Sequence, residues 1–193
     1  MTRLVAAIVL AGGRGRRLGG VDKPGLPARD GRSLLDGVLA AVPGVIVVVV
    51  GPTRELAPGI VSVREDPPGG GPAAAVAAGY HALTDLPADG LVAVLAADLP
   101  FVTAATVERL RRAVDRHPDA GGAVLVDPDG RRQHLLGVWR RDALSAAIAH
   151  RGSWHGASLS GLLARIPVIE LMALGDEAAD VDTPADLHRW LEP

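Results

Sequence analysis

The stretch Leu4-Val5-Ala6-Ala7-Ile8-Val9-Leu10-Ala11-Gly12-Gly13 places an uninterrupted aliphatic run directly before a pair of glycines. A short run of this kind is typical of a strand that is buried on both faces of a sheet. The segment 12–20 that follows contains five glycines and three arginines. The sequence therefore predicts a first strand that ends in a glycine-rich, cationic loop, at the edge where open α/β sheets bind their ligands.

Similar aliphatic runs recur along the rest of the chain, at residues 45–50, 60–63, 91–96, 123–126, 135–140 and 168–171. Segments with helical signals lie between them. Residues 33–42 open with Ser33 as a cap, residues 72–83 open with a proline, and residues 103–117 open with Thr103 as a cap. Alternation of the two kinds of segment predicts βαβ units and a mostly parallel sheet.

The expected fold class is a Rossmann-like, three-layer α/β/α sandwich. The runs at 123–126 and 135–140 are separated by a Pro-Asp-Gly turn, so we expect an antiparallel strand or hairpin in the C-terminal half. With 193 residues, 48% of them hydrophobic, and no linker or repeat, residues 1–193 are expected to form one domain. On the helix at 103–117, the arginines face away from the apolar stripe and are expected to be solvated.

Composition excludes several classes of function. Twenty basic residues against 22 acidic ones give a net charge of −2, so no overall field attracts nucleic acid or an anionic membrane. No apolar run is long enough for a membrane helix. The histidines show no zinc-binding spacing, and the few aromatic residues form no base-stacking platform. The absence of cysteine is compatible with a reducing compartment, and we expect a cytoplasmic protein.

Lys23 is the only lysine among twenty basic residues, and it lies directly behind the glycine-rich loop. Arginine offers a planar fork, whereas lysine carries a compact charge on a flexible stem that can follow a phosphate through a reaction. Glycines bring main-chain N–H groups close to phosphate oxygens, and arginines add charge-assisted bonds. The position of Lys23 therefore points to phosphate chemistry.

Two familiar phosphate-binding loops do not fit the spacing. The dinucleotide pattern G-x-G-x-x-G lacks its third glycine here, since Leu18 stands in that position, and no acidic residue closes the second strand. A Walker-type loop needs Gly-Lys-Ser/Thr, whereas Lys23 follows Asp22 and precedes Pro24. An NAD site and a P-loop NTPase are thus excluded.

The string Leu10-Ala11-Gly12-Gly13, followed by Arg17-Leu18-Gly19-Gly20-Val21-Asp22-Lys23, resembles the motif of nucleotidyltransferases, and more narrowly that of molybdenum cofactor guanylyltransferases. Further pieces follow in the order of that family. They are Glu65-Asp66, Gly70-Gly71-Pro72 before a helix, Ala97-Asp98-Leu99-Pro100-Phe101 after a strand, and Asp180-Val181-Asp182-Thr183-Pro184. The resemblance covers nearly the whole chain.

The resemblance implies a set of site residues. Those expected to bind the nucleotide are Leu10, Ala11, Gly12, Gly13, Lys23, Asp66 and Asp98. It also implies that Asp98 binds Mg²⁺. The residues themselves support this last role, because a carboxylate at the end of an apolar strand is costly to bury without a cation or water. Three roles stay open for Asp182: a metal ligand, a contact to the second substrate, or an ordinary helix start.

The expected reaction is the Mg²⁺-dependent transfer of GMP from GTP to the phosphate of molybdopterin, with release of pyrophosphate. Lys23, Arg17 and Asp98 would be catalytic, and Lys23 with Arg17 would neutralise charge on the leaving pyrophosphate. A phosphate nucleophile needs no general base, and the sequence offers none. GTP and molybdopterin are the expected partners, and proteins of cofactor assembly are further possible ones.

One departure from the family pattern bears on the base. Gly51-Pro52-Thr53 stands where the family tends to have an Asn after the second strand, so a side-chain contact is lost there. Two alternatives therefore stay open. One is a cytidylyltransferase for molybdopterin or for a sugar or alcohol phosphate. The other is a noncatalytic nucleotide-binding module that has lost transfer.

Overall fold

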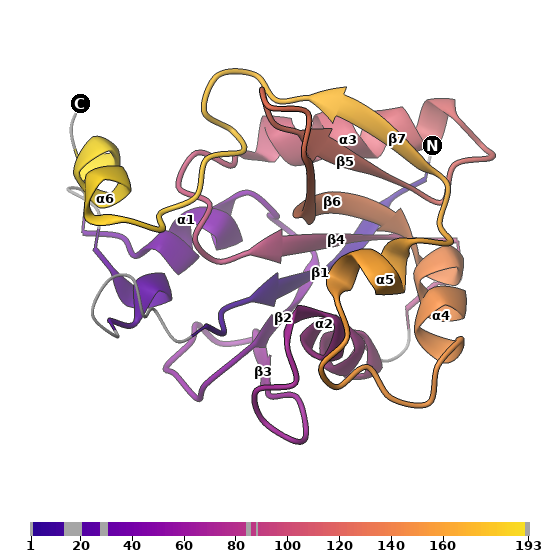
Figure 1. Ribbon diagram of the computed structural model, residues 1–193, viewed down its shortest axis with the longest axis horizontal. Coiled ribbons are helices and arrows are strands. Elements are labelled where there is room, and N and C mark those ends of the chain that lie inside the picture. Colours follow the sequence, from indigo (N-terminus) through magenta and orange to yellow (C-terminus); the bar gives the residue numbers. More distant parts are fainter. Residues whose placement is uncertain (1, 14–20, 28–30, 84–85, 88, 192–193) are drawn as a thin grey trace.

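The computed structural model describes residues 2–13, 21–27, 31–83, 86–87 and 89–191. Within these residues, seven strands form one sheet in the order β3-β2-β1-β4-β6-β5-β7 (Figure 1). The strands are β1 Leu4–Leu10, β2 Ile46–Val50, β3 Val61–Val63, β4 Leu91–Ala96, β5 Gly122–Val126, β6 Arg132–Arg140 and β7 Val168–Met172. β6 runs antiparallel to its neighbours β4 and β5, and the other neighbouring strands are parallel. The predicted mostly parallel sheet with an antiparallel strand in the C-terminal half is confirmed.

The helices are η2 Lys23–Gly25, a 3₁₀ turn, and α1 Leu34–Ala40, α2 Pro72–His81, α3 Ala104–Arg116, α4 Arg141–Ala149, α5 Leu159–Leu163 and α6 Pro184–Leu191. Helices α1 to α5 cover the two faces of the sheet. Alternate residues of β1 belong to separate cores: Ala7 and Val9 pack with α1 and α3, and Ala6 and Ile8 pack with α2, α4 and α5. The expected three layers are therefore present, with one apolar core on each side of the sheet.

The predicted caps begin two of these helices. The Ser33 hydroxyl accepts a hydrogen bond from the Asp36 N–H at the start of α1, and the Thr103 hydroxyl accepts one from the Thr106 N–H at the start of α3. In both helices the third helical residue also bonds back to the cap, which makes a capping box. These reciprocal bonds explain why the helices begin where the sequence predicts.

The carboxyl ends of β1, β2 and β4 meet at one edge of the sheet. Beyond the strands, the Ala11 N–H donates to the Val50 carbonyl at 2.8 Å, and the Ala97 N–H donates to the Leu10 carbonyl at 3.0 Å. The C-terminal segment reaches the same edge, where the Val181 N–H donates to the Asp98 carbonyl at 3.2 Å. This edge thus gathers loops from the beginning, middle and end of the chain. No helix in the described part of the chain is long and apolar enough to span a membrane.

Candidate active site

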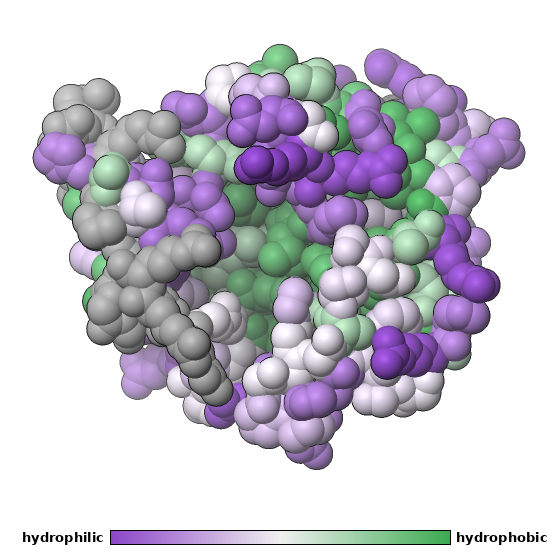
Figure 2. Space-filling view, viewed as in Figure 1, coloured by the Kyte–Doolittle hydropathy of each residue, from purple (hydrophilic) through white to green (hydrophobic). Residues whose placement is uncertain are grey.

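A cleft of about 840 Å³ opens at the edge where these strands end. Its lining comes from Leu10, Gly12, Gly13, Lys23, Pro24, Val50, Gly51, Pro52, Arg64, Glu65, Pro68, Gly69, Gly71, Pro72, Ala75, Ala96, Ala97, Asp98, Leu135 and Asp182. Figure 2 shows this face of the molecule hollowed near its centre, with apolar side chains at the bottom of the hollow and hydrophilic ones above it in this view. A cleft at the carboxyl ends of parallel strands is the ordinary ligand site of an open α/β sheet.

Lys23 projects into this cleft from the 3₁₀ turn η2. Its side chain is only 13% exposed, and Nζ lies 3.7 Å from Asp98 Oδ2 and within hydrogen-bonding contact of Asp182 Oδ1. Asp98 follows β4 by two residues, and Asp182 precedes α6 by two residues. The structure therefore brings together one ammonium and two carboxylates that are far apart in the sequence.

Carboxylates outnumber the ammonium at this point. Partial burial raises the pKa of Asp98, Lys23 opposes that rise, and the nearby Asp180 and Asp182 add to it. The pKa of Asp180 is also raised, first by loss of solvent and then by the charge of Asp182. A site that holds several negative charges in partial burial favours the arrival of a further cation.

The donors of the cleft suit a hard divalent ion such as Mg²⁺. Asp98 supplies carboxylate oxygens with a side chain that is 27% exposed, so it is shielded and still accessible. In the described residues, no three His, Cys, Asp or Glu side chains are grouped so as to hold a metal ion among them. Proteins commonly bind Mg²⁺ through one or two carboxylates together with substrate phosphates and water.

The other predicted nucleotide-binding residues near β1 divide into two groups. Leu10, Gly12 and Gly13 line the cleft. Ala11 does not, because its methyl group is buried in the core and its N–H and carbonyl bond to Val50 and Arg54. Arg17 lies outside the described residues, so its expected role in catalysis stays a prediction.

The loop after β2 reaches the cleft through Gly51 and Pro52, whereas Thr53 is not among the lining residues. A Cβ atom built on Gly51 would lie 2.7 Å from the Ala11 carbonyl oxygen and 3.0 Å from the Gly12 nitrogen. A side chain at position 51 therefore cannot be accommodated unless the backbone after β1 moves. The loops after β1 and β2 thus touch directly at Gly51.

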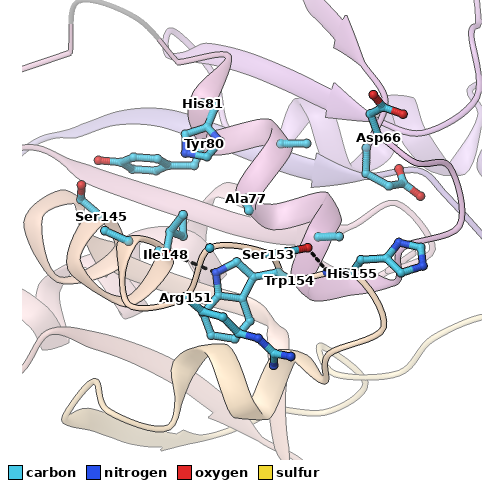
Figure 3. Close-up of a pocket in the computed structure, with 15 residues that line it drawn as sticks. Asp66, Ala77, Tyr80, His81, Ser145, Ile148, Arg151, Ser153, Trp154 and His155 are labelled. Atoms are coloured by element: carbon cyan, nitrogen blue, oxygen red, sulfur yellow. Dashed lines mark hydrogen bonds between the residues drawn. The ribbon is translucent and has the colours of Figure 1, made fainter.

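Asp66 lies at a second cavity, of about 420 Å³, between α2 and the segment that follows α4. In Figure 3, Asp66 projects from the loop after β3 on the same side as His155, and the Trp154 indole at the centre donates to the Ile148 carbonyl. Glu65, its neighbour, lines both this cavity and the main cleft. The predicted contact of Asp66 with the nucleotide thus stays a prediction.

Several residues at the cleft were given no role from the sequence. Arg64 and Leu135 line it, as does Glu65 of the quoted Glu65-Asp66 pair, and Asp180 acts on the charge of Asp98. Asp180 belongs to the quoted Asp180-Val181-Asp182 motif, so its spacing from Asp182 was the available signal. Leu135 carried no signal, because an aliphatic residue at the start of a predicted strand is normally part of the core.

Comparison with known proteins identifies the family. The model of the MobA-like NTP transferase domain matches residues 7–166. The chain is 32% identical to the molybdenum cofactor guanylyltransferase of Rhodobacter capsulatus, over 96% of this chain and 94% of that protein.

Two solved structures share the fold. One is the molybdopterin-guanine dinucleotide biosynthesis protein A of Archaeoglobus fulgidus, with a TM-score of 0.73, 20% identity and coverage of 97% of each chain. The other is the Rv0371C protein of Mycobacterium tuberculosis in complex with manganese, with a TM-score of 0.66, 24% identity and coverage of 100% of each chain. The chain therefore belongs to the family of MobA-like NTP transferase domains, together with the molybdenum cofactor guanylyltransferases, and is a nucleotidyltransferase.

Proposed function

We propose that this protein transfers GMP from GTP to the terminal phosphate of molybdopterin and releases pyrophosphate, in a reaction that requires Mg²⁺. The observation that carries the proposal is the approach of the Lys23 ammonium to the Asp98 carboxylate in one cleft, at the carboxyl ends of β1 and β4. The Rhodobacter capsulatus relative is named a molybdenum cofactor guanylyltransferase, which supports the choice of base and acceptor.

The residues of the chain position the triphosphate and neutralise its charge. Gly12 and Gly13 line the cleft without side chains, so their main-chain groups are open to a phosphate. Lys23, which is held between two carboxylates, presents its ammonium to the oxygens of the leaving pyrophosphate as negative charge develops there. Release from Asp182 lets its flexible stem follow those oxygens.

The acceptor reacts without help from a protein base. A phosphate monoester is already anionic at neutral pH, so its oxygen attacks the α-phosphorus in line and no proton has to be removed. Catalysis then depends on holding the two phosphates in line and on charge stabilisation, as in phosphoryl transfer generally. Of the described residues that line the cleft, none is a histidine, which is consistent with this scheme.

Asp98 is the residue that would hold Mg²⁺, with Asp182 as a second candidate. When bound, the ion supplies Lewis-acid stabilisation of the phosphate oxygens. The crystal structure of the Mycobacterium tuberculosis protein with manganese supports a divalent ion in this fold. The protein's own part is to keep Asp98 ionised and oriented, and Lys23 contributes to this by lowering the pKa that burial raises.

Guanine is proposed over cytosine on the strength of the relatives, since Gly51 offers no side chain for reading the base. We further propose that residues 1–193 act as one nucleotidyltransferase domain in the cytoplasm. Proteins that deliver molybdopterin or receive the product are the expected partners.

The test is a nucleotide panel. Purified protein, Mg²⁺ and molybdopterin are combined with GTP, CTP or ATP, and pyrophosphate release and the dinucleotide product are measured. We expect product with GTP, and no product when Mg²⁺ is removed by a chelator. Product with CTP alone would replace guanylyl by cytidylyl transfer, and GTP binding without any product would identify a noncatalytic module.

A further inference from the structure

Arg54, in the loop after β2, makes a two-pronged contact that spans the glycine-rich segment. Its Nη2 donates to the Ala11 carbonyl at 3.1 Å and to Asp22 Oδ1 at 3.2 Å, and its Nη1 donates to Asp22 Oδ2 at 3.3 Å. The side chain is only 13% exposed, although Asp22 lies at the surface. The guanidinium thus holds a carboxylate with both of its terminal nitrogens and a main-chain carbonyl with one of them.

The two groups that Arg54 holds lie on either side of the glycine-rich segment 12–20. Ala11 directly follows β1 and precedes that segment, and Asp22 comes after it, one residue before Lys23. Arg54 itself comes from a third piece of chain, which is already pressed against Ala11 at Gly51. A single side chain therefore fixes the distance between the end of β1 and the turn that carries Lys23.

We propose that Arg54 is a positioning residue for nucleotidyl transfer, acting as a clasp between the end of β1 and the turn that carries Lys23, which fixes the location of Lys23. The inference rests on the proposed function, since it assigns Arg54 a task within that reaction. Ion pairs that involve a surface carboxylate contribute little to global stability. The effect of the clasp is therefore expected in the geometry of the site, where displacement of about 1 Å lowers rates by about 100-fold.

The fork of arginine is needed for this task. Two parallel bonds to a carboxylate fix its orientation as well as its distance, and a third bond to a carbonyl ties it to the strand. A lysine offers one point charge in place of two nitrogens in a fixed plane. Arg54→Lys keeps the charge and loses the fork, so it separates positioning from simple charge attraction.

The chain provides a closely matched control in Arg111, on α3. Its side chain is 11% exposed, its Nε and Nη2 donate to the Glu108 carboxylate, and its Nη1 donates to the Thr2 carbonyl at 2.9 Å. Arg111 therefore has the same burial and the same kind of partners as Arg54. It holds the chain at the opposite end of β1 from the cleft.

The first experiment measures amide hydrogen exchange by mass spectrometry in the full-length protein, and it needs no ligand. Arg54→Ala and Arg54→Lys should raise exchange in peptides that cover residues 9–27. Arg111→Ala should leave those peptides unchanged. Unchanged exchange at 9–27 in both Arg54 variants would overturn the clasp, whatever reaction the protein catalyses.

The second experiment measures kcat and KM for GTP in the transfer assay. Both Arg54 variants should lower kcat/KM by about 10- to 100-fold, and Arg111→Ala should lower it by less than about twofold. If Arg54 acts through Lys23, Arg54→Ala should cost much less in a Lys23→Ala background, and the effect of the double variant should fall well short of the product of the single effects.

Three results would overturn this assignment: full activity in Arg54→Lys, an equal loss in Arg111→Ala, or effects of Arg54→Ala and Lys23→Ala that simply multiply. Multiplying effects would mean that Arg54 contacts the nucleotide independently of Lys23. If the parent protein transfers no GMP at all, the proposed function fails, and the exchange experiment alone decides whether Arg54 closes the segment.

Discussion

Lys23 lies 3.7 Å from Asp98 and also contacts Asp182, so its ammonium is oriented by two carboxylates before any phosphate arrives. In the proposed mechanism Lys23→Ala removes the charge that meets the leaving pyrophosphate, and we expect kcat to fall by about 100- to 1,000-fold. Steady-state pyrophosphate release measures the loss, and circular dichroism checks the fold. Lys23→Arg should also be impaired, because a planar fork cannot replace a point charge at this position. A parental rate in Lys23→Ala would remove the residue from the mechanism.

Asp98 is expected to act on the metal rather than on the nucleotide. Asp98→Asn keeps the shape of the side chain and removes the charge, so the Mg²⁺ concentration that gives half-maximal activity should rise about tenfold or more. A magnesium titration at saturating GTP measures this shift. Asp115→Asn serves as the control, since that carboxylate accepts a bond from the Thr2 N–H at the far end of β1. Identical titrations for Asp98→Asn and the parent would argue against the metal role.

At this scale the sequence predicted the residues whose type is unusual for their position. Lys23 was the only lysine, and Asp98 was an acid at the end of an apolar strand. Arg54 carried no such signal, because one of nineteen arginines in a loop is unremarkable and its partners are 32 and 43 positions away. Contacts between side chains that are distant in sequence depend on the tertiary fold, so the pattern of residue types does not contain them.

The close packing of α2 against the sheet requires glycine at position 79, because a side chain there would meet the sheet. A Cβ there would lie 2.5 Å from Ile8 Cγ2 and 2.9 Å from Val50 Cγ2, so Gly79→Ala forces the helix away from the sheet. We expect a loss of about 1–3 kcal/mol in the free energy of unfolding, although alanine favours helix.

Gly37, within α1, is the matched control because a Cβ there meets no atom within 4 Å. Gly37→Ala should stabilise the protein by up to about 1 kcal/mol through helix propensity alone. Urea denaturation of both variants measures the two effects. Equal shifts of the same sign would show that space next to Ile8 does not limit the position of α2.

Glu108 on α3 links stability to pH. The hydrogen bond from Arg111, with a further one from Arg112, lowers the pKa of Glu108 from 4.5 to about 2. A lowered pKa contributes stability above pH 4.5 that is lost as the pH falls through about 2. Because the side chain is 40% exposed, solvent screens the pair and Glu108→Gln should cost at most about 1 kcal/mol at pH 7.

Chemical denaturation of the parent and of Glu108→Gln at several pH values measures this dependence. The difference in unfolding free energy between the two proteins should shrink steadily between pH 4.5 and about 2. A difference that stays constant over this interval would mean that Glu108 acts through packing and not through its charge.

Among the elements, strands were predicted more accurately than short helices. β1 and β4 have the predicted bounds, because buried parallel strands are uninterrupted aliphatic runs. α4 was not predicted, since Arg140 before it makes no capping hydrogen bond and so gives no start signal. The prediction of solvated arginines on α3 was wrong for Arg111, which is largely buried. The apolar stripe of α3 indicated which side of the helix faces the core. It did not indicate that Thr2, at the start of the chain, lies across the other side and accepts a hydrogen bond from Arg111.

The order of strands in the sheet is a property of the whole molecule that local patterns did not provide. Alternating strands and helices predict parallel pairs, but they do not place β6 between β4 and β5 or β7 at the edge. That order decides the site, because it sets β1 between β2 and β4 and so brings their three loops together. The pattern of residues predicted the layers and a ligand edge after the first strand, and the family resemblance named the further residues expected there.

The cleft joins distant parts of the chain, so nucleotide binding should stabilise the whole fold. Lys23 follows β1, Asp98 follows β4 and Asp182 precedes α6, and all three line one cleft. GTP with Mg²⁺ at about 100 times its Kd should add about 2.7 kcal/mol of stability. For a chain of this size that corresponds to a rise of about 5–10 °C in Tm, measured by a thermal shift assay.

Two comparisons make this measurement specific. Lys23→Ala should show a smaller rise in Tm at the same GTP concentration, because it lacks the ammonium that is proposed to neutralise the triphosphate. Asp66→Asn distinguishes the two cavities. An unchanged rise in Tm in this variant would place the nucleotide in the cleft of Lys23 alone. A reduced rise in Tm would extend the site to the loop after β3. A full rise in Lys23→Ala together with no rise in Asp66→Asn would move the nucleotide to the second cavity and contradict the assignment of the cleft.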